Sequence, residues 1–552
     1  MAKARAPRKI PAQQEAAAAV KAEAVAATAL EKGELITSET QVQTGQFKEE
    51  EPGVWEGYVE WEKYPEKKKV GHELMKATKF PPPPEFQLAP LPKRNPVLYG
   101  DLYKDFHHAI GLDTVPEYSW GRVLKEKAST MTHVLAFPYN GEPNHEFLMK
   151  DPITPNEDHF VRNHGGIPKC VRPDKYKLQI GGKVNKEISI SLADLRDPQK
   201  FPQQKLAVTL QCCGTRRIEQ IALYPGHGLL VPNAPWPEGA IGNAVYTGVL
   251  LKDVLERACD GINVDKVKAH AEFISADTYF KFNQVYNYAV SVPYRFVDKD
   301  SVMLAWEMNG KPLPEIHGYP LRIVVPGVIG ARSAKWVTRI NILDEPSWGP
   351  VQRMEYLYYC NTQYGKHNTL FSNGFSIERM PVSSAIMKPN DGNIIIHDGQ
   401  IKLEGWAYSG GENWVERVEC SVDGGFTWYP VPEENLSKKH YYTWRLWKAS
   451  IPLDMEGWCE VLVRAWDSSC NTQPISVRSV WNWDLHVTQS CHKIKVYSVN
   501  RTKPLTAQRL KEYEEAGLDF ASEPITRPVP WPLESMEDYK ARYNKYPREP
   551  QD

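Results

Sequence analysis

Gln211-Cys212-Cys213-Gly214-Thr215-Arg216-Arg217 is the stretch from which the fold and the chemistry of this chain are most directly inferred. It follows the apolar run Leu206 to Leu210, which predicts a β-strand. Two guanidinium groups a few residues away lower the pKa of a thiol, and the thiolate is the form that binds soft metals or attacks electrophiles. A buried structural cysteine is the alternative, because free cysteine is among the most buried residue types.

The flanking sequence predicts two domains of different texture. From about 100 to 345, helical candidates such as Thr247 to Ala258 alternate with β-rich runs such as Leu321 to Val325, which indicates a mixed α/β unit. From about 382 onward, short strand-like runs are broken by Asn390-Asp391-Gly392, Gly410-Gly411 and Asp423-Gly424-Gly425. Turns at this spacing are typical of a β-sandwich.

Both ends of the chain have the composition of tails. The first 35 residues are alanine-rich, start basic and place their first acid at Glu15, which favours a mitochondrial presequence. Their poverty in serine counts against it and leaves the cytoplasm as the alternative. The run Pro81 to Pro84 and six prolines from Pro524 to Pro550 predict extended, poorly self-packing segments over 1–100 and 501–552. Such tails are suited to bind a larger protein assembly.

The overall composition excludes several classes of protein. With 552 residues the chain has room for two or three domains. Lys plus Arg 67 against Asp plus Glu 68 gives a net charge of −1, so no global field recruits nucleic acid or an anionic membrane. No run approaches the roughly 20 apolar residues of a membrane span, which predicts a soluble protein. Nine cysteines without a C-x-x-C pair disfavour a zinc site and indicate a reducing compartment.

Several further segments resemble the sulfite oxidase and eukaryotic nitrate reductase family in order and spacing, from about residue 155 to 495. The matching segments are Phe160-Val161-Arg162-Asn163-His164, Thr209-Leu210-Gln211-Cys212, Glu307-Met308-Asn309-Gly310-Lys311-Pro312-Leu313-Pro314, Val325-Pro326-Gly327, Gly330-Ala331-Arg332-Ser333-Ala334-Lys335-Trp336, Gly405-Trp406-Ala407-Tyr408-Ser409 and Trp444-Arg445-Leu446-Trp447. The resemblance implies an α+β protein with a mixed α/β molybdopterin-binding domain over 101–375. An immunoglobulin-like dimerisation domain over 376–500 would follow, with tails at both ends.

The resemblance also implies a molybdenum-bearing pterin cofactor with Cys212, rather than Cys213, as the metal ligand. The residues that would bind the cofactor are Phe160, Val161, Arg162, Asn163, His164, Asp277, His317, Arg322, Ser333, Ala334 and Lys335. Arg322 and Lys335 suit the cofactor phosphate, because charged donors bind phosphate well. Without the family resemblance, His164 or His317 alone would more often be a core residue whose hydrogen bonds are made within the protein.

On the substrate side, the resemblance implies a pocket for a small oxyanion such as sulfite or nitrate. Arg162, Arg217, Trp236 and Tyr356 would line it beside Cys212. A desolvated oxyanion needs donors of this kind. Tyr356 would assist proton transfer, with a simply packed aromatic side chain as the equally common alternative.

Asp484 departs from the family pattern, because sulfite oxidases typically place at this position an arginine that reaches back to the anion. Reversing a charge about 5 Å from an anion turns a favourable contribution of roughly 3 kcal/mol into a penalty, at an effective dielectric near 20. We also find no cytochrome b5 module and no flavin or nicotinamide domain, so we expect neither haem nor flavin. Electrons would pass to a cytochrome, to oxygen or to a partner subunit.

Two functional hypotheses follow. The first is an active molybdenum oxidoreductase that performs two-electron oxygen-atom transfer on a small oxyanion, most readily a sulfite-like one. The second is a structural or assembly subunit of a large complex, built on the same fold with reduced or no catalysis, which Asp484 and the long tails favour. Turnover of substrate discriminates them better than metal content does.

Overall fold

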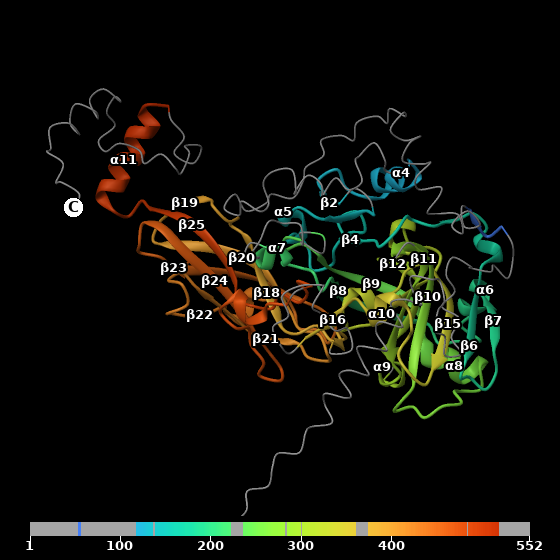
Figure 1. Cartoon of the computed structure of the whole chain (residues 1–552). Helices are drawn as coiled ribbons and strands as arrows, with labels where there is room; N and C mark the ends of the chain where they lie inside the picture. Colours follow the sequence, from blue (N-terminus) through green and yellow to red (C-terminus); the bar gives the residue numbers. More distant parts are fainter. Residues whose placement is uncertain are drawn as a thin grey trace, which may run out of the picture.

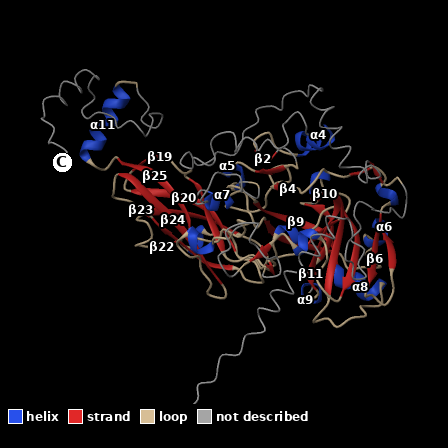
Figure 2. Cartoon of the chain, in the orientation of Figure 1, coloured by secondary structure: helices blue, strands red, loops and turns tan. Residues whose placement is uncertain are grey.

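The computed structural model places two β-rich units side by side (Figure 1). It describes residues 53–56, 117–135, 138–221, 234, 236–281, 284–299, 301–359, 374–482 and 484–517. The predicted presequence, the run Pro81 to Pro84 and the prolines from Pro524 to Pro550 lie outside these residues. Strands predominate over short helices within the described part (Figure 2), so the predicted α+β class is confirmed with more strand than helix.

The first unit is built on two large sheets. One has the strand order β11-β10-β15-β6-β7, in which β6 runs parallel to β15 and the other neighbours are antiparallel. Its strands are β6 (Lys177–Gly182), β7 (Ile188–Ser191), β10 (His270–Lys281), β11 (Gln284–Pro293) and β15 (Val337–Leu343). The other has the order β13-β12-β9-β8, with β14 also paired to β12. Its strands are β8 (Gln204–Gln211), β9 (Ile241–Leu250), β12 (Met303–Met308), β13 (Lys311–Pro312) and β14 (Arg322–Val324).

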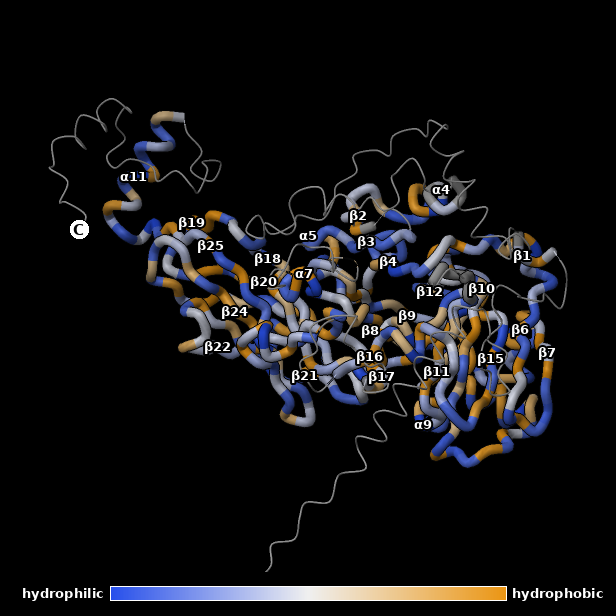
Figure 3. Tube along the Cα trace, in the orientation of Figure 1, coloured by the Kyte–Doolittle hydropathy of each residue, from blue (hydrophilic) through white to orange (hydrophobic). Residues whose placement is uncertain are grey.

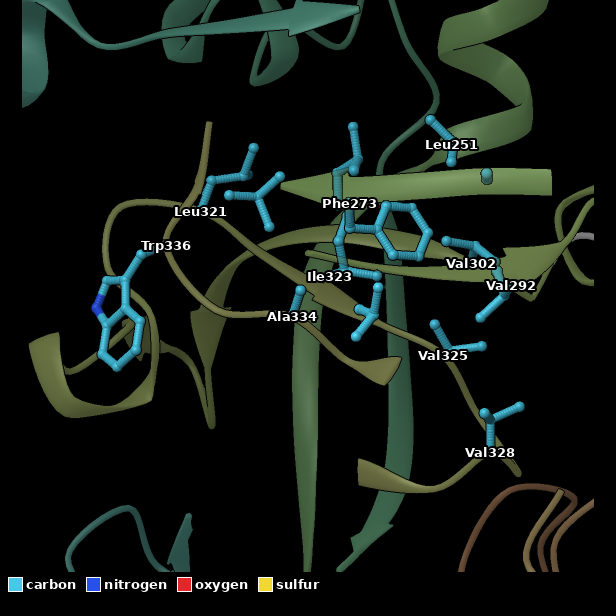
Figure 4. Close-up of a cluster of buried hydrophobic side chains, with 14 of the residues drawn as sticks. Leu251, Phe273, Val292, Val302, Leu321, Ile323, Val325, Val328, Ala334 and Trp336 are labelled. Atoms are coloured by element: carbon cyan, nitrogen blue, oxygen red, sulfur yellow. The ribbon is translucent and has the colours of Figure 1, made fainter. Parts of the chain in front are cut away.

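Apolar side chains from both sheets meet in one core (Figure 4). Phe273 of β10, Val292 of β11 and Ile323 of β14 are fully buried there. Apolar residues recur along the strands (Figure 3), and β9, β12 and β14 are buried along almost their whole length. Each such side chain contributes about 1.5 to 3 kcal/mol by leaving water. The core therefore holds the sheets as a rigid frame for the loops at their ends.

The predicted strand before Cys212 is confirmed as β8. It pairs antiparallel with β9, and the register ends at Gln211 opposite Ile241. The Cys212 N–H continues the ladder by donating to the Ala240 carbonyl at 2.9 Å. Beyond it the chain turns into the short helix α7 (Arg217–Ile221). Cys212 thus stands where a firmly paired strand ends.

The predicted helix from Thr247 to Ala258 is wrong in its first four residues. Residues 247–250 belong to β9, and the helix α8 spans Leu251–Ala258. Thr247 pairs with Glu307 of β12 and with Lys205 of β8, so strand pairing on both sides outweighs the local helical pattern.

The second unit is the predicted β-sandwich. Its sheets have the orders β18-β20-β23 and β19-β25-β24-β21-β22. The strands are β18 (Ser383–Lys388), β19 (Ile394–His397), β20 (Gln400–Tyr408), β21 (Val415–Ser421), β22 (Tyr429–Pro430), β23 (Arg445–Pro452), β24 (Gly457–Asp467) and β25 (His492–Asn500). Leu403, Trp447, Val461 and Val496 are fully buried in its core. Gly392, Gly411 and Gly424 have positive φ at the predicted turns.

The described residues include a short piece of each predicted tail. In the N-terminal one, β1 (Trp55–Glu56) pairs with β5 (Lys169–Cys170), and the buried Trp55 ring meets Tyr176 edge-on at 6.4 Å. In the C-terminal one, α11 (Pro504–Glu515) follows β25 and lies beyond the sandwich (Figure 1). Among the described residues, no helix has the length and apolarity that a membrane span needs.

Candidate active site

A pocket lies in the first unit, and the space within it, including the part open to solvent, is about 660 Å³. Its walls come from both sheets and from the loops between their strands. The lining residues are His159, Phe160, Val161, Arg162, His164, Leu210, Cys212, Asp277, Tyr288, His317, Arg322, Gly330, Ala331, Ser333, Ala334, Lys335 and Tyr356. Nearly all of the residues that the sequence analysis assigns to the cofactor are thus brought together around one cavity.

Cys212 presents a thiol prepared to ionise. A hydrogen bond from Cys213, the charges of Arg217 and Arg162, and the Gly214 N–H lower the pKa of the Cys212 thiol to about 6, although burial opposes the shift. The Gly214 N–H lies 3.3 Å from Sγ. A side chain at Gly214 would collide with Arg217, because its Cβ would come within 2.5 Å of the guanidinium. At neutral pH the residue is therefore largely a thiolate, the form that binds a soft metal.

Cys213 lies in the turn that follows β8 and is not among the described residues that line the pocket. Its Sγ contacts His486 Nδ1 at 3.3 Å, and burial raises the pKa of its thiol well above the usual value. Cys212 therefore lines the pocket and Cys213 does not, and the assignment of Cys212 as the metal ligand stays a prediction.

Buried cations gather at the pocket. Arg322 donates to the His317 and Ser333 carbonyls at 3.0 and 3.3 Å. Lys335 donates to the Asn163 side chain and to the Arg162 and Ile316 carbonyls. Burial lowers the pKa of both Arg322 and Lys335, because their charges are removed from water. An anion placed between them would relieve that cost.

Three polar atoms around the pocket have no hydrogen-bond partner within the described part of the chain. They are Asp277 Oδ1, Asn163 Nδ2 and His159 Nε2, and all are buried. Burial raises the pKa of Asp277 to about 7, although the charge of Lys335 opposes this. Buried polar groups are rarely left unpaired, so these atoms indicate a ligand with both donors and acceptors.

Tyr356 and His164 form a pair at the pocket wall. The Tyr356 hydroxyl lies 2.6 Å from His164 Nε2, and burial raises the pKa of Tyr356 well above its usual value. Tyr356 has a φ of +54°, a conformation that non-glycine residues adopt only where neighbouring contacts hold them. The hydroxyl therefore stays protonated and is held beside the His164 ring.

Arg217 and Trp236, both predicted to contact the anion, do not line the pocket within the described residues. Arg217 is buried behind Cys212 and donates to the Leu485 carbonyl at 2.9 Å and to the Ala234 carbonyl at 2.8 Å. Trp236 is fully buried in the same core cluster as Cys212. From these positions, Arg217 acts on the pocket through its charge, and Trp236 supports the wall.

Asp484 lies elsewhere than the sequence analysis assumes. Its carboxylate binds His486 Nε2 at 2.6 Å and is not part of the pocket wall. Its charge is therefore separated from a bound anion by the imidazole ring, not placed directly beside it.

Sequence reasoning missed five lining residues: His159, Leu210, Tyr288, Gly330 and Ala331. Leu210, Gly330 and Ala331 lie within segments that already carry the resemblance, and His159 directly precedes another, so those segments held the signal that could have found them. Tyr288 had no such signal, because it reaches the pocket through the pairing of β11 with β10.

A second group of ionisable side chains, here called the interdomain cluster, joins the two units. It comprises Glu142, His145, Glu219, Glu238 and His492, with Glu238 bound to His145 at 3.4 Å and to His492 at 3.2 Å. The Ile386 N–H donates to His492 Nδ1, so Nε2 carries the ring proton and faces the carboxylates as a donor. A metal could bind Nε2 only if that nitrogen carried no proton, so the arrangement favours an ion-pair network over a metal centre.

Comparison with known proteins agrees with this geometry. Residues 164–351 match the oxidoreductase molybdopterin binding domain, and residues 375–499 match the Mo-co oxidoreductase dimerisation domain. Sulfite oxidase of Arabidopsis thaliana is 33% identical over 374 residues, which cover 65% of this chain and 91% of that protein. The chain belongs to the sulfite oxidase family. Mitochondrial sulfite oxidase of Homo sapiens is 36% identical over 367 residues, covering 65% of this chain and 64% of the human protein.

A solved member of the same fold is the sulfane dehydrogenase SoxCD from Paracoccus pantotrophus. It has a TM-score of 0.53 and 24% identity, and the match covers 66% of this chain and 84% of that one. This likeness concerns the fold alone. The sulfite oxidase family is defined by a molybdopterin-binding domain, and the pocket fits that group: a thiolate at one side, buried cations and three unpaired polar atoms.

Proposed function

We propose that this chain is a molybdenum-cofactor oxidoreductase that transfers an oxygen atom to or from a small oxyanion, with a sulfite-like substrate. The observation that carries the proposal is the Cys212 thiolate in the wall of a pocket lined by buried cations. When bound, the cofactor would supply the two-electron redox chemistry of the metal. The protein would bind the cofactor, orient the substrate and donate a proton to it.

Each part of the pocket has a role in this proposal. Cys212 would ligate the metal, because its pKa of about 6 leaves it ionised at neutral pH. Arg322 and Lys335 would bind the cofactor phosphate, and Asp277, Asn163 and His159 would pair with the polar edge of the pterin. These contacts would satisfy charges and polar atoms that the protein alone leaves buried.

On the substrate side, Arg162 is the guanidinium that lines the pocket beside Cys212, since its charge helps to lower the Cys212 pKa. Tyr356 would donate its hydroxyl proton to a substrate oxygen, with His164 as its hydrogen-bond partner. The sandwich would pair two chains, because it matches the Mo-co oxidoreductase dimerisation domain. A cytochrome, oxygen or a partner subunit would accept the electrons.

The second candidate is a structural subunit with reduced catalysis. It is favoured by Arg217, whose guanidinium donates to two protein carbonyls, and by the extra buried acid Asp484. Both features lower the cationic character of the site.

The test is to measure molybdenum content and sulfite-dependent reduction of an artificial acceptor for wild type, Cys212→Ser and Cys213→Ser. We expect stoichiometric metal and turnover in wild type and Cys213→Ser, and loss of turnover in Cys212→Ser. A serine hydroxyl stays protonated where the thiol ionises, which is why it fails as a ligand. A metal-free, inert wild type would contradict the proposal and favour the structural subunit.

A further inference from the structure

The segment from Asp484 to Val487 supports the Cys212 loop from behind. The Val487 N–H donates to the Cys213 carbonyl at 2.7 Å, and the Leu485 carbonyl accepts from Arg217 Nε. Leu485 and Val487 both have positive φ, at +54° and +56°. A β-branched residue avoids this conformation, so the contacts with the Cys212 loop hold the segment in place.

His486 stands between these two strained residues and links Arg217 to Asp484. Its Nδ1 lies 3.2 Å from Arg217 Nη2, and its Nε2 lies 2.6 Å from Asp484 Oδ2. Because a guanidinium only donates, Nδ1 must accept, and the ring proton is on Nε2, where it is donated to the carboxylate. The three side chains are therefore a cation, a neutral imidazole in one tautomer and an anion.

The same ring positions Tyr356. The imidazole of His486 stacks on the Tyr356 ring at 5.2 Å between centroids and 21° between planes. Tyr356 in turn reaches His164 through its hydroxyl. Fixing the His486 ring through both nitrogens therefore fixes the plane in which the Tyr356 hydroxyl can lie.

The charge of Asp484 reaches the pocket through this arrangement. It is a buried counter-charge to Arg217, one imidazole ring away, so it offsets part of the positive charge that Arg217 contributes beside Cys212. Arg162 then remains the guanidinium of the pocket wall on this side. A site with this balance attracts a doubly charged oxyanion less than two uncompensated arginines would.

We propose that Asp484 and His486 form a positioning dyad that orients Arg217 and Tyr356 and, by compensating the charge of Arg217, makes the site select singly charged over doubly charged oxyanions. The proposal rests on the proposed function, because it assigns an oxyanion to this pocket. Asp484 thus determines specificity without touching the anion.

The test is to titrate the purified chain with nitrate and with sulfate by calorimetry, for wild type and Asp484→Asn. The asparagine keeps an oxygen that accepts from His486 Nε2 but removes the charge. We expect nitrate to bind roughly threefold more tightly and sulfate roughly tenfold, because the electrostatic gain doubles with the charge of the ligand. Asp467→Asn, which removes a buried carboxylate within the sandwich, should change neither affinity.

A second pair of variants tests the positioning role. In His486→Gln, the amide can accept from Arg217 and donate to Asp484, so the preference for nitrate over sulfate should be retained. In His486→Leu, both bonds are lost, and turnover should fall at saturating substrate because the Tyr356 ring loses its support. Loss of sulfate affinity in Asp484→Asn, or equal changes for both anions, would overturn the proposal.

These outcomes separate the dyad from the function on which it rests. Molybdenum content and sulfite turnover of wild type report on the proposed function alone. The ratio of the two anion affinities in Asp484→Asn reports on the dyad, whether or not the chain turns over. An active enzyme whose ratio stays constant in Asp484→Asn refutes the dyad and leaves the function standing.

Discussion

Replacing Arg216 by methionine should uncouple the two units of the chain. Arg216 is fully buried and binds Glu219 through two bonds, at 2.6 and 2.8 Å. Its Nη1 also donates to the Ser384 and Ser490 carbonyls of the sandwich, at 3.0 and 2.7 Å. One guanidinium of the first unit thus holds two backbone segments of the second.

The magnitude follows from these contacts. Removing one partner of a buried ion pair costs about 3 to 5 kcal/mol, and leaving two buried carbonyls unpaired adds to this. We take about 5 kcal/mol as the net loss, since such contributions are not additive. For units of this size, that loss lowers the melting temperature by about 10 to 20 °C.

Differential scanning calorimetry should show the wild type melting in one main transition and Arg216→Met in two, the first of them earlier. Arg445→Met is the matched control, because Arg445 is also buried and its side chain, within the described residues, bonds to Glu433 and Ser437 of its own unit. It should lower the stability of the sandwich without separating the transitions. A shift below about 2 °C in Arg216→Met would show that the guanidinium does not couple the units.

The other predictions concern a glycine and the interdomain cluster. Gly318→Ala should lower both the molybdenum content and the thermal stability, because Gly318 has a φ of +110° and an added Cβ would press against Lys335 and Arg322. Gly310→Ala is the control: Gly310 has a φ of +73°, but open space surrounds it, so this variant should keep its metal. Although burial opposes it, Glu142 and Glu238 raise the pKa of His145 to about 9. The stabilisation by His145, about 2 kcal/mol, should be complete below pH 6.5 and disappear as the pH rises to 9. The melting-temperature difference between wild type and His145→Gln should shrink over that range, and a constant difference would contradict the assignment.

Much of the pocket could be predicted from the sequence because its residues lie in short, contiguous segments. The choice of Cys212 over Cys213 rested on the resemblance; in the structure Cys212 lines the pocket, whereas Cys213 lies in the following turn with its Sγ against His486. The boundary at Leu250 was missed because pairing on both edges of β9, and not local pattern, decides it.

Asp484 shows where sequence reasoning fails. Its identity and position along the chain were evident, but its partner was not, because a contact with His486 depends on two residues of the segment having positive φ. Nothing in the residue types of that segment predicts such a conformation. Trp55 is a similar case. The composition of the sequence around it predicts a tail, and the pairing of Trp55 with Cys170 shows that it packs on the first unit.

The support of the Cys212 loop by His486 also has a consequence for biosynthesis. Cys213 and His486 are separated by 273 positions along the chain, yet their contact is part of what shapes the loop. At about 5 to 20 residues per second, a ribosome needs on the order of half a minute to make the intervening chain. The loop therefore lacks its contact with His486 while the first unit is emerging and can take its final shape only after the sandwich has been translated.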